Sequence, residues 1–165
     1  AVVRELVART MAFVDAERNA LLDHLEIAGA APLTDRAVVE VVVGPLARQL
    51  RTPDGRRYLR LCAQLITHPR FVNDPREALL MSRSAQRCAQ HLAGALAHLP
   101  TAISVERASQ VIGFLIRACG DQARLLDAPE PSRAPLGIEA FSANLVDTML
   151  AILHAPTTAR LDGQE

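Results

Sequence analysis

The chain contains no lysine and no tryptophan, and only one tyrosine and four phenylalanines occur among its 165 residues. All 18 positively charged side chains are therefore arginines, and 18 carboxylates balance them. The arginines are spread along the chain rather than clustered, so we expect no basic face of the kind that holds a nucleic acid. We interpret the missing lysines, together with abundant Ala and Leu, as a mark of GC-rich coding rather than of a particular chemistry.

Long apolar runs are also missing. No run approaches the roughly 18 residues of a membrane span, and no signal-peptide pattern opens the chain, so we expect no membrane partner. Cys62, Cys88 and Cys119 are odd in number and fall within helical patterns, which argues against a disulfide framework. The interpretation is buried, reduced thiols in a cytoplasmic protein.

Catalytic and metal-binding motifs are missing as well. The chain has no Gly-rich phosphate loop, nucleophile elbow or paired-carboxylate motif. Its five histidines form no His-x-x-x-His or Glu-x-x-His pair. Cys88 and His91 are three residues apart on one helical face, but such a pair more often packs than catalyses. We predict no catalytic residue, no metal site and no cofactor.

What the chain has is helical periodicity. Apolar residues recur at three- and four-residue spacing, no repeat is visible, and no segment is convincing as a strand. The predicted fold class is all-α, a six-helix bundle over residues 1–156 followed by a polar tail over 157–165. The six predicted helices cover residues 2–28, 35–51, 53–67, 76–98, 102–126 and 138–154.

The stretch from Pro45 to Pro69 fixes the helical class most clearly. Thr52 can cap a helix whose first residue is Pro53, because the N–H that proline lacks would be unpaired there. Thr34 is expected to cap the preceding helix in the same way. Pro45 removes one backbone hydrogen bond inside that helix and should kink it.

The last two predicted helices suggest a partner. Gly113 and Gly120 lie among bulky residues, which lets another helix approach closely. Helix 138–154 is apolar on more than one face, as expected if one side meets its own core and the other a partner subunit. A central core helix is the alternative. The predicted interface residues are Val111, Leu115, Ala118, Leu145, Met149 and Ile152.

A ligand pocket is suggested by polarizable or polar-tipped residues on otherwise aliphatic helices. If the helices splay around Pro45, these residues could line an apolar pocket with a few hydrogen-bonding groups. Taken singly, each is more often an ordinary core residue. The candidate pocket residues are Phe13, Tyr58, Cys62, Met81, His91 and Phe114.

Four passages also carry a family resemblance through their order and spacing. They are residues 15–23, 45–61, 95–100, and 111–125 followed by 139–147. Together they resemble the C-terminal, ligand-binding and dimerisation domain of TetR/AcrR-type transcriptional regulators. None of them is a strict motif.

The resemblance implies a homodimer through the last two helices, packed as an intermolecular four-helix bundle, and a small-molecule effector pocket among the first five. It also implies that operator DNA is bound by an upstream helix-turn-helix unit. Ala1 in place of an initiator Met, and a first helix without a cap, fit a start at the family's fourth helix.

The function expected from the resemblance is the regulatory domain of a one-component regulator. We expect a repressor that a small apolar or amphipathic ligand releases from operator DNA. The alternatives from other classes are a helical enzyme or metal-binding bundle, and a helical interaction module without a ligand cavity.

Overall fold

The computed structural model describes residues 2–29, 32–66 and 82–158, with side chains from residue 10 onward. Within these ranges every regular element is a helix, so the predicted all-α, six-helix architecture is confirmed. The helices are α1 (Val2–Ala28), α2 (Asp35–Arg48), α3 (Pro53–Leu65), α5 (Arg83–Leu96), α6 (Thr101–Asp127) and α7 (Ile138–His154), with a 3-10 turn η1 (Gln49–Arg51) after α2.

The predicted bounds agree closely with these helices except for the predicted fourth helix, 76–98, which is interrupted at Ser82, an extended residue that caps α5. The predicted second helix, 35–51, corresponds to α2 and η1 together, and α2 continues through Pro45 to Arg48. The predicted fourth helix begins outside the described residues, and α5 starts at Arg83. None of the described helices has the length and apolar character needed to cross a membrane.

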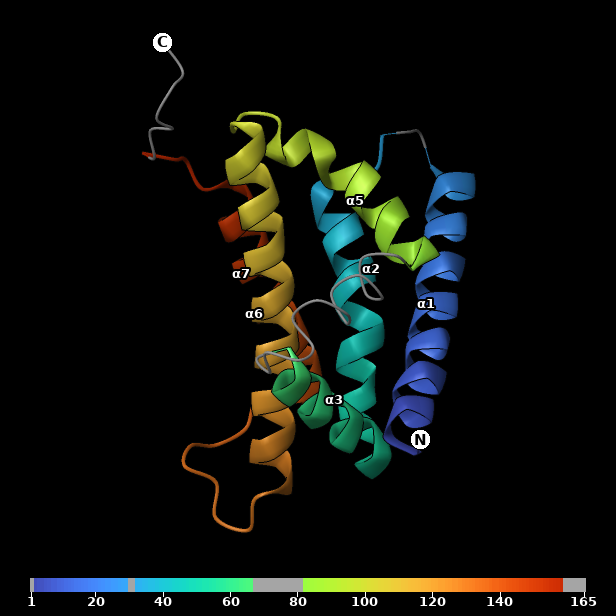
Figure 1. The fold of residues 1–165 in the computed structure, drawn as a ribbon, viewed down its shortest axis with the longest axis vertical. Helices are drawn as coiled ribbons and strands as arrows, with labels where there is room; N and C mark the ends of the chain where they lie inside the picture. The colour runs from blue at the N-terminus through green and yellow to red at the C-terminus, as the bar shows by residue number, and fades with distance from the viewer. Residues whose placement is uncertain (1, 30–31, 67–81, 159–165) are drawn as a thin grey trace.

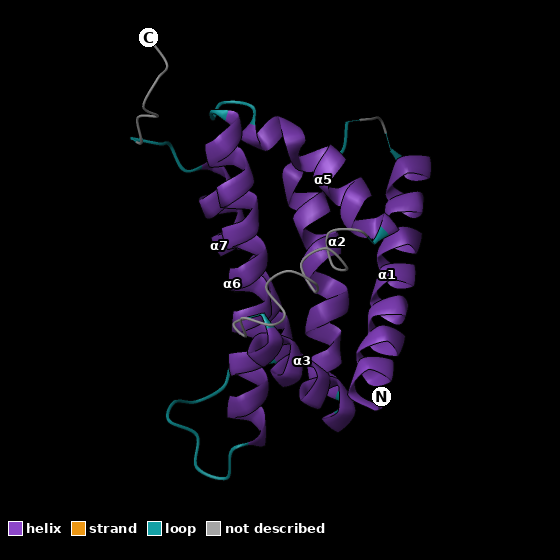
Figure 2. Cartoon of the chain, in the orientation of Figure 1, coloured by secondary structure: helices purple, strands orange, loops and turns teal. Residues whose placement is uncertain are grey.

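Four of the described helices run along the length of the molecule, and two others cross them (Figure 1). Helices α1, α2, α6 and α7 follow the long axis, with α2 in the middle in contact with α1, α5 and α7. Helix α5 crosses near one end and α3 near the other. Figure 2 shows the same arrangement, with loops between the helices and after α7.

Side-chain caps start three of the helices, as their sequences require. The Thr34 hydroxyl accepts the Ala37 N–H at 3.2 Å, and the Thr52 hydroxyl accepts the Gly55 N–H at 3.0 Å. Ser82 caps α5 by accepting the Ala85 N–H at 3.2 Å. The caps predicted at Thr34 and Thr52 are therefore confirmed.

The core lies where α2 meets its neighbours. A large cluster joins α2 and α3 to α6 and α7, and a smaller one joins α1, α2 and α5 around Leu22 and Cys88. The most enclosed members of the large cluster include Val39, Val43 and Cys119, each 0% exposed.

Helix α3 approaches α6 very closely at Gly120. A Cβ atom placed on Gly120 would collide with the Cβ of Ala63 and lie 3.2 Å from the carbonyl oxygen of Leu59. The close approach predicted for Gly120 is therefore made by a helix of the same chain. Gly113, two helical turns earlier on the same face of α6, borders open space, so no other part of the described chain approaches it closely.

Candidate ligand-binding cavities

An apolar cavity of about 180 Å³ lies between α2, α5, α6 and α7, and we call it the inner cavity. Its walls are aliphatic except for one charged side chain, Arg18, which enters from α1. The lining residues are Arg18, Val42, Leu46, Ala85, Cys88, Ala89, Leu92, Leu96, Ala108, Val111, Ile112, Leu115, Ile116, Met149 and Leu153.

A second cavity of about 210 Å³, the outer cavity, lies nearer α1 and α3. It is lined by Met11, Ala12, Val14, Asp15, Arg18, Leu46, Tyr58 and Ser82. Arg18 and Leu46 line both cavities, so these two side chains stand between them.

Arg18 is the most unusual residue of the site. Its side chain is buried, with the residue only 7% exposed, and one guanidinium nitrogen (Nη2) donates to the Val42 carbonyl at 2.6 Å. Its Nε–H has no hydrogen-bond partner, and within the described residues no carboxylate forms an ion pair with it. Burial lowers the pKa of Arg18, but a guanidinium remains charged in proteins. The site therefore holds a buried positive charge with unused donor capacity.

The nearest acidic group of this cluster, Asp15, is committed to the start of α5. Its Oδ1 accepts the backbone N–H of Ser84 at 2.9 Å. Burial acts to raise the pKa of Asp15, but hydrogen bonds from Ser84 and Ser82 and the charge of Arg18 outweigh it and hold that pKa below its ordinary value. Asp15 therefore serves mainly to anchor α5 on α1.

Other polar groups near the cavities are neutral. The Tyr58 hydroxyl and the Cys62 thiol share a hydrogen bond, and burial raises the pKa of both, that of Cys62 to about 11. Burial also raises the pKa of Cys88, and that of Cys119 to about 12. These thiols are poor nucleophiles at neutral pH.

The candidate pocket residues predicted from the sequence fall into several places. Tyr58 lines the outer cavity and is 2% exposed, with Cys62 beside it on α3. Phe13 and Phe114 are exposed by 60% and 37% and line neither cavity. His91 pairs instead with Glu26 at 3.0 Å. Met81 lies outside the described residues.

The predicted interface residues mostly face inward. Val111, Leu115, Leu145 and Met149 are each 5% exposed or less within this chain, and the first two and Met149 line the inner cavity. Ala118 and Ile152 are partly buried. Their part in pairing with a second copy stays a prediction.

Sequence reasoning missed Arg18, although the sequence carries a signal for it. Val14 and Leu22 lie four residues on either side, and both are buried. Positions four apart share one helical face, so Arg18 occupies the apolar stripe of α1. Charged residues are rarely buried unless they are paired, so a charged residue in a buried stripe marks a place where a polar partner is needed.

No metal-binding arrangement is present in the part of the chain that the structure describes. No group of three or more His, Cys, Asp or Glu side chains there could hold a metal ion.

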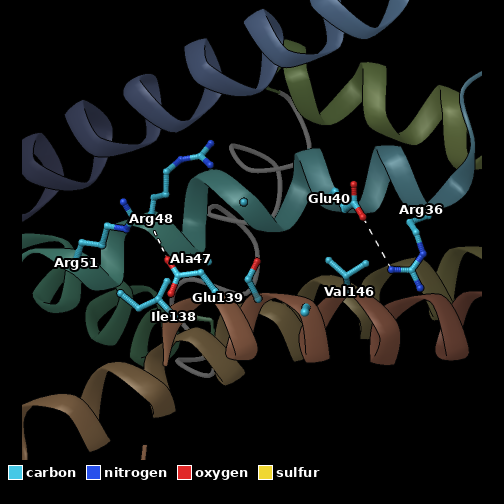
Figure 3. Close-up of a pocket in the computed structure, with 11 residues that line it drawn as sticks. Arg36, Glu40, Ala47, Arg48, Arg51, Ile138, Glu139 and Val146 are labelled. Carbon is cyan, nitrogen blue, oxygen red and sulfur yellow. Dashed lines mark hydrogen bonds and ion pairs between the residues drawn. The ribbon is translucent and has the colours of Figure 1, made fainter. Parts of the chain in front are cut away.

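A third, more open space is the groove between α2 and α7, of about 360 Å³ (Figure 3). Charged residues line it, and each of them has a partner: Arg51 contacts Glu139 at 2.9 Å, and Arg36 contacts Glu40 at 3.9 Å. Arg48 pairs with Glu17 of α1, outside the groove. At its end Arg36 also contacts Asp147 on α7 at 2.6 Å. These ion pairs link the outer sides of two helices and leave the groove without a free charge of the Arg18 kind.

In the part of the chain that the structure describes, the fold is an all-helical domain with cavities between its helices. The chain belongs to the family described as tetracyclin repressor-like, C-terminal domain, whose family model matches residues 40–151. It is thus the regulatory domain of a transcriptional regulator. Comparison with curated proteins and with solved structures found no match.

Proposed function

We propose that this domain senses a small apolar or amphipathic effector in the inner cavity and thereby controls the operator binding of a transcriptional repressor. The single observation that carries the proposal is the partly open, mostly apolar cavity of about 180 Å³ at the junction of α2, α5, α6 and α7. Well-packed cores contain few voids larger than a water molecule, so a cavity of this size needs a reason.

The size and lining of the inner cavity indicate its ligands. A dry, apolar protein cavity of about 150 Å³ is able to bind benzene. The inner cavity is slightly larger and similarly lined, which suits a molecule of one ring or a short branched chain. Burial of apolar surface contributes about 25 cal/mol per Å², so such a ligand binds without many polar contacts.

The proposed mechanism is linkage between the effector and operator DNA. The effector favours one arrangement of the helices, and it weakens operator binding by the ratio of its affinities for the two arrangements and by no more. Helix α1 is the natural element to transmit ligand binding to the DNA-binding unit. Arg18, near the middle of α1, lines the cavity. The first residues of α1 lead toward the helix-turn-helix unit that the resemblance places upstream. The protein would act in the cytoplasm.

Binding in the cavity is tested by calorimetry and thermal shift with toluene and benzyl alcohol as neutral probes. We expect both to stabilise the domain and to bind with a negative heat-capacity change. Ala108→Leu should abolish this, because its larger side chain fills the cavity. The matched control is Ala20→Leu on the exposed side of α1, which should leave binding unchanged. Unaltered binding to Ala108→Leu would place the probes elsewhere.

Coupling to DNA is tested on the intact gene product with its upstream region. An effector found in the first screen should lower the affinity for operator DNA in fluorescence anisotropy, and Ala108→Leu should keep the DNA affinity but lose the response. If the effector raised the affinity instead, the protein would be an effector-dependent binder rather than a repressor released by its ligand.

We further propose that the domain forms a homodimer through the outward faces of α6 and α7. Residues already buried in the core cannot also touch a second copy, so the outer positions of these helices are the ones available. On α7 these are Ala140, Ala143, Asn144 and Ala151, which are exposed and small enough for helices to approach closely.

The dimer is tested by light scattering during size-exclusion chromatography. Ala151→Arg should convert the dimer to a monomer, since it places a long charged side chain in the proposed contact. Ala20→Arg on α1 is the control and should remain dimeric. A wild-type monomer at high concentration would contradict the proposal.

A further inference from the structure

We propose that the effector is a small carboxylic acid, whose carboxylate binds the guanidinium of Arg18 while its apolar body fills the inner cavity. The inference rests on the proposed function, because it assigns the chemical class of the ligand in that same cavity. Neither the family match nor the apolar walls call for an anion, so the assignment comes from Arg18 alone.

The first argument is that the buried positive charge of Arg18 lacks an ion-pair partner. The residue is 7% exposed, its Nε–H has no partner, and no described carboxylate forms an ion pair with it. Burying a charged group is costly unless it is paired and hydrogen-bonded. Asp15 acts on the charge of Arg18 without forming an ion pair with it, and its two oxygens accept the Ser84 N–H and the Asn19 side-chain amide. A bound anion would complete the site.

The second argument is the geometry of the missing partner. A guanidinium presents its N–H groups as a planar fork that matches a carboxylate in two parallel hydrogen bonds. On the Nε edge these two donors are Nε–H, which has no partner, and one N–H of Nη2, whose other N–H can serve the Val42 carbonyl. Because Nε is fully buried, the Arg18 side chain has to turn toward the cavity before a carboxylate can bind this edge.

The third argument is the shape of the space around that charge. Arg18 is the one charged residue among the lining residues of the inner cavity, and the walls beyond it are aliphatic or made of Cys88 and small alanines. A ligand that satisfies both features has one anionic group and a compact apolar body. By the size comparison with benzene, a benzoate-like ring or a short branched chain fits.

Arg18 also provides a route from ligand to signal. It belongs to α1 and holds the backbone of α2 through the Val42 carbonyl, three residues before Pro45. A carboxylate on the same guanidinium weakens the hydrogen bond from Arg18 to the Val42 carbonyl and thereby shifts α1 relative to α2. The outer cavity, which Arg18 also lines, gives the anion a way to reach it.

The test compares benzoate with two neutral molecules of similar shape, benzamide and benzyl alcohol, by calorimetry. Wild-type protein should bind benzoate at least tenfold more tightly than either. Arg18→Met should lose this preference but still bind benzyl alcohol, and Arg18→Lys should retain part of it. The control is Arg117→Met, an exposed arginine of α6, which should behave as wild type.

A second measurement avoids reliance on a variant that fails to fold. In ¹⁵N-labelled wild-type protein, the Arg18 Nε–H resonance should shift on addition of benzoate and stay in place with benzyl alcohol. Ala108→Leu should abolish the shift by filling the cavity.

The outcomes separate the two proposals. If benzyl alcohol binds in the cavity but benzoate binds no more tightly, or if Arg18→Met keeps the preference, the carboxylate assignment is wrong and the effector cavity stands. If neither probe binds and neither shifts a resonance of a cavity residue, the cavity is not a ligand site and both proposals fall.

Discussion

The two short helices that cross the bundle are held in opposite ways. Helix α3 buries Leu59 and Ala63 against α6, and at Gly120 the two helices leave no room for a side chain. Helix α5 buries only Ser84 and Cys88. Its partly buried Leu92 and Leu96 also pack against the apolar clusters. Its contacts with α1 include the ion pairs of Arg87 with Asp23 and Glu26 at 2.7 and 2.8 Å.

This difference indicates which end of the molecule adapts to a ligand. Apolar contacts without voids are rigid, whereas partly exposed polar contacts open at low cost. Helix α5 also forms one wall of the inner cavity through Leu92 and Leu96. We therefore expect α3 and α6 to form the fixed part of the domain and α5 to shift when an effector binds.

The largest effect should come from truncating a leucine in each helix. Leu59→Ala removes a side chain that is 2% exposed in the tight contact, and it should lower the free energy of unfolding by about 2–5 kcal/mol. Leu92→Ala should cost less, about 1–2 kcal/mol, because Leu92 is only partly buried and already borders a void. Urea unfolding followed by circular dichroism measures both. Equal losses would contradict the contrast between α3 and α5.

The second-largest effect compares two glycine substitutions, which should change the free energy of unfolding in opposite directions. Gly120→Ala should destabilise the domain by about 1–3 kcal/mol, since the new methyl group collides with Ala63. Gly94→Ala in α5 meets nothing within 4 Å, so it should stabilise by about 0.5–1 kcal/mol through a better helix propensity. The two midpoints in urea should therefore move in opposite directions. A loss in both variants would mean that the α5 side is as tightly packed as the α3 side.

The helices of this fold could be predicted from sequence because their signals are local. The three- and four-residue spacing and the capping hydroxyls of Thr34 and Thr52 act within a few residues, and they gave bounds close to those observed. The family resemblance rested on the order of four passages, and the family match covers most of that span.

The candidate site was harder to predict because it depends on how the helices cross. Periodicity shows that Leu115 and Met149 face something apolar, but it does not tell whether that neighbour is the same chain or a second copy. The polarizable rings of Phe13 and Phe114 make them candidate pocket residues in the sequence, yet both side chains are substantially exposed in the structure. The cavity exists because α5 crosses α2 on its way from α1 to the start of α6, and no local pattern encodes that crossing (Figure 1).

The smallest effect concerns the polar anchor of α5 and its dependence on pH. In the unfolded chain the pKa of Asp15 is about 3.9. In the folded protein this pKa is lower, because hydrogen bonds from Ser84 and Ser82 outweigh the effect of burial. The stability that this carboxylate contributes is therefore complete well above pH 4, and it is lost as the pH falls through the folded-state pKa. Since Asp15 is partly exposed, we expect only about 0.5–1 kcal/mol at pH 7.

Two variants of Asp15 isolate this contribution from general acid unfolding. Asp15→Ala should be less stable than wild type at pH 7, and the difference should shrink toward zero near pH 3. Asp15→Asn keeps an oxygen that accepts the Ser84 N–H but does not titrate, so its difference from wild type should reverse in favour of the variant in acid. Hydrogen exchange should show the acid-induced opening in α5 before α3. Simultaneous opening of both helices would mean that α5 is held by its apolar contacts and not by its polar anchor.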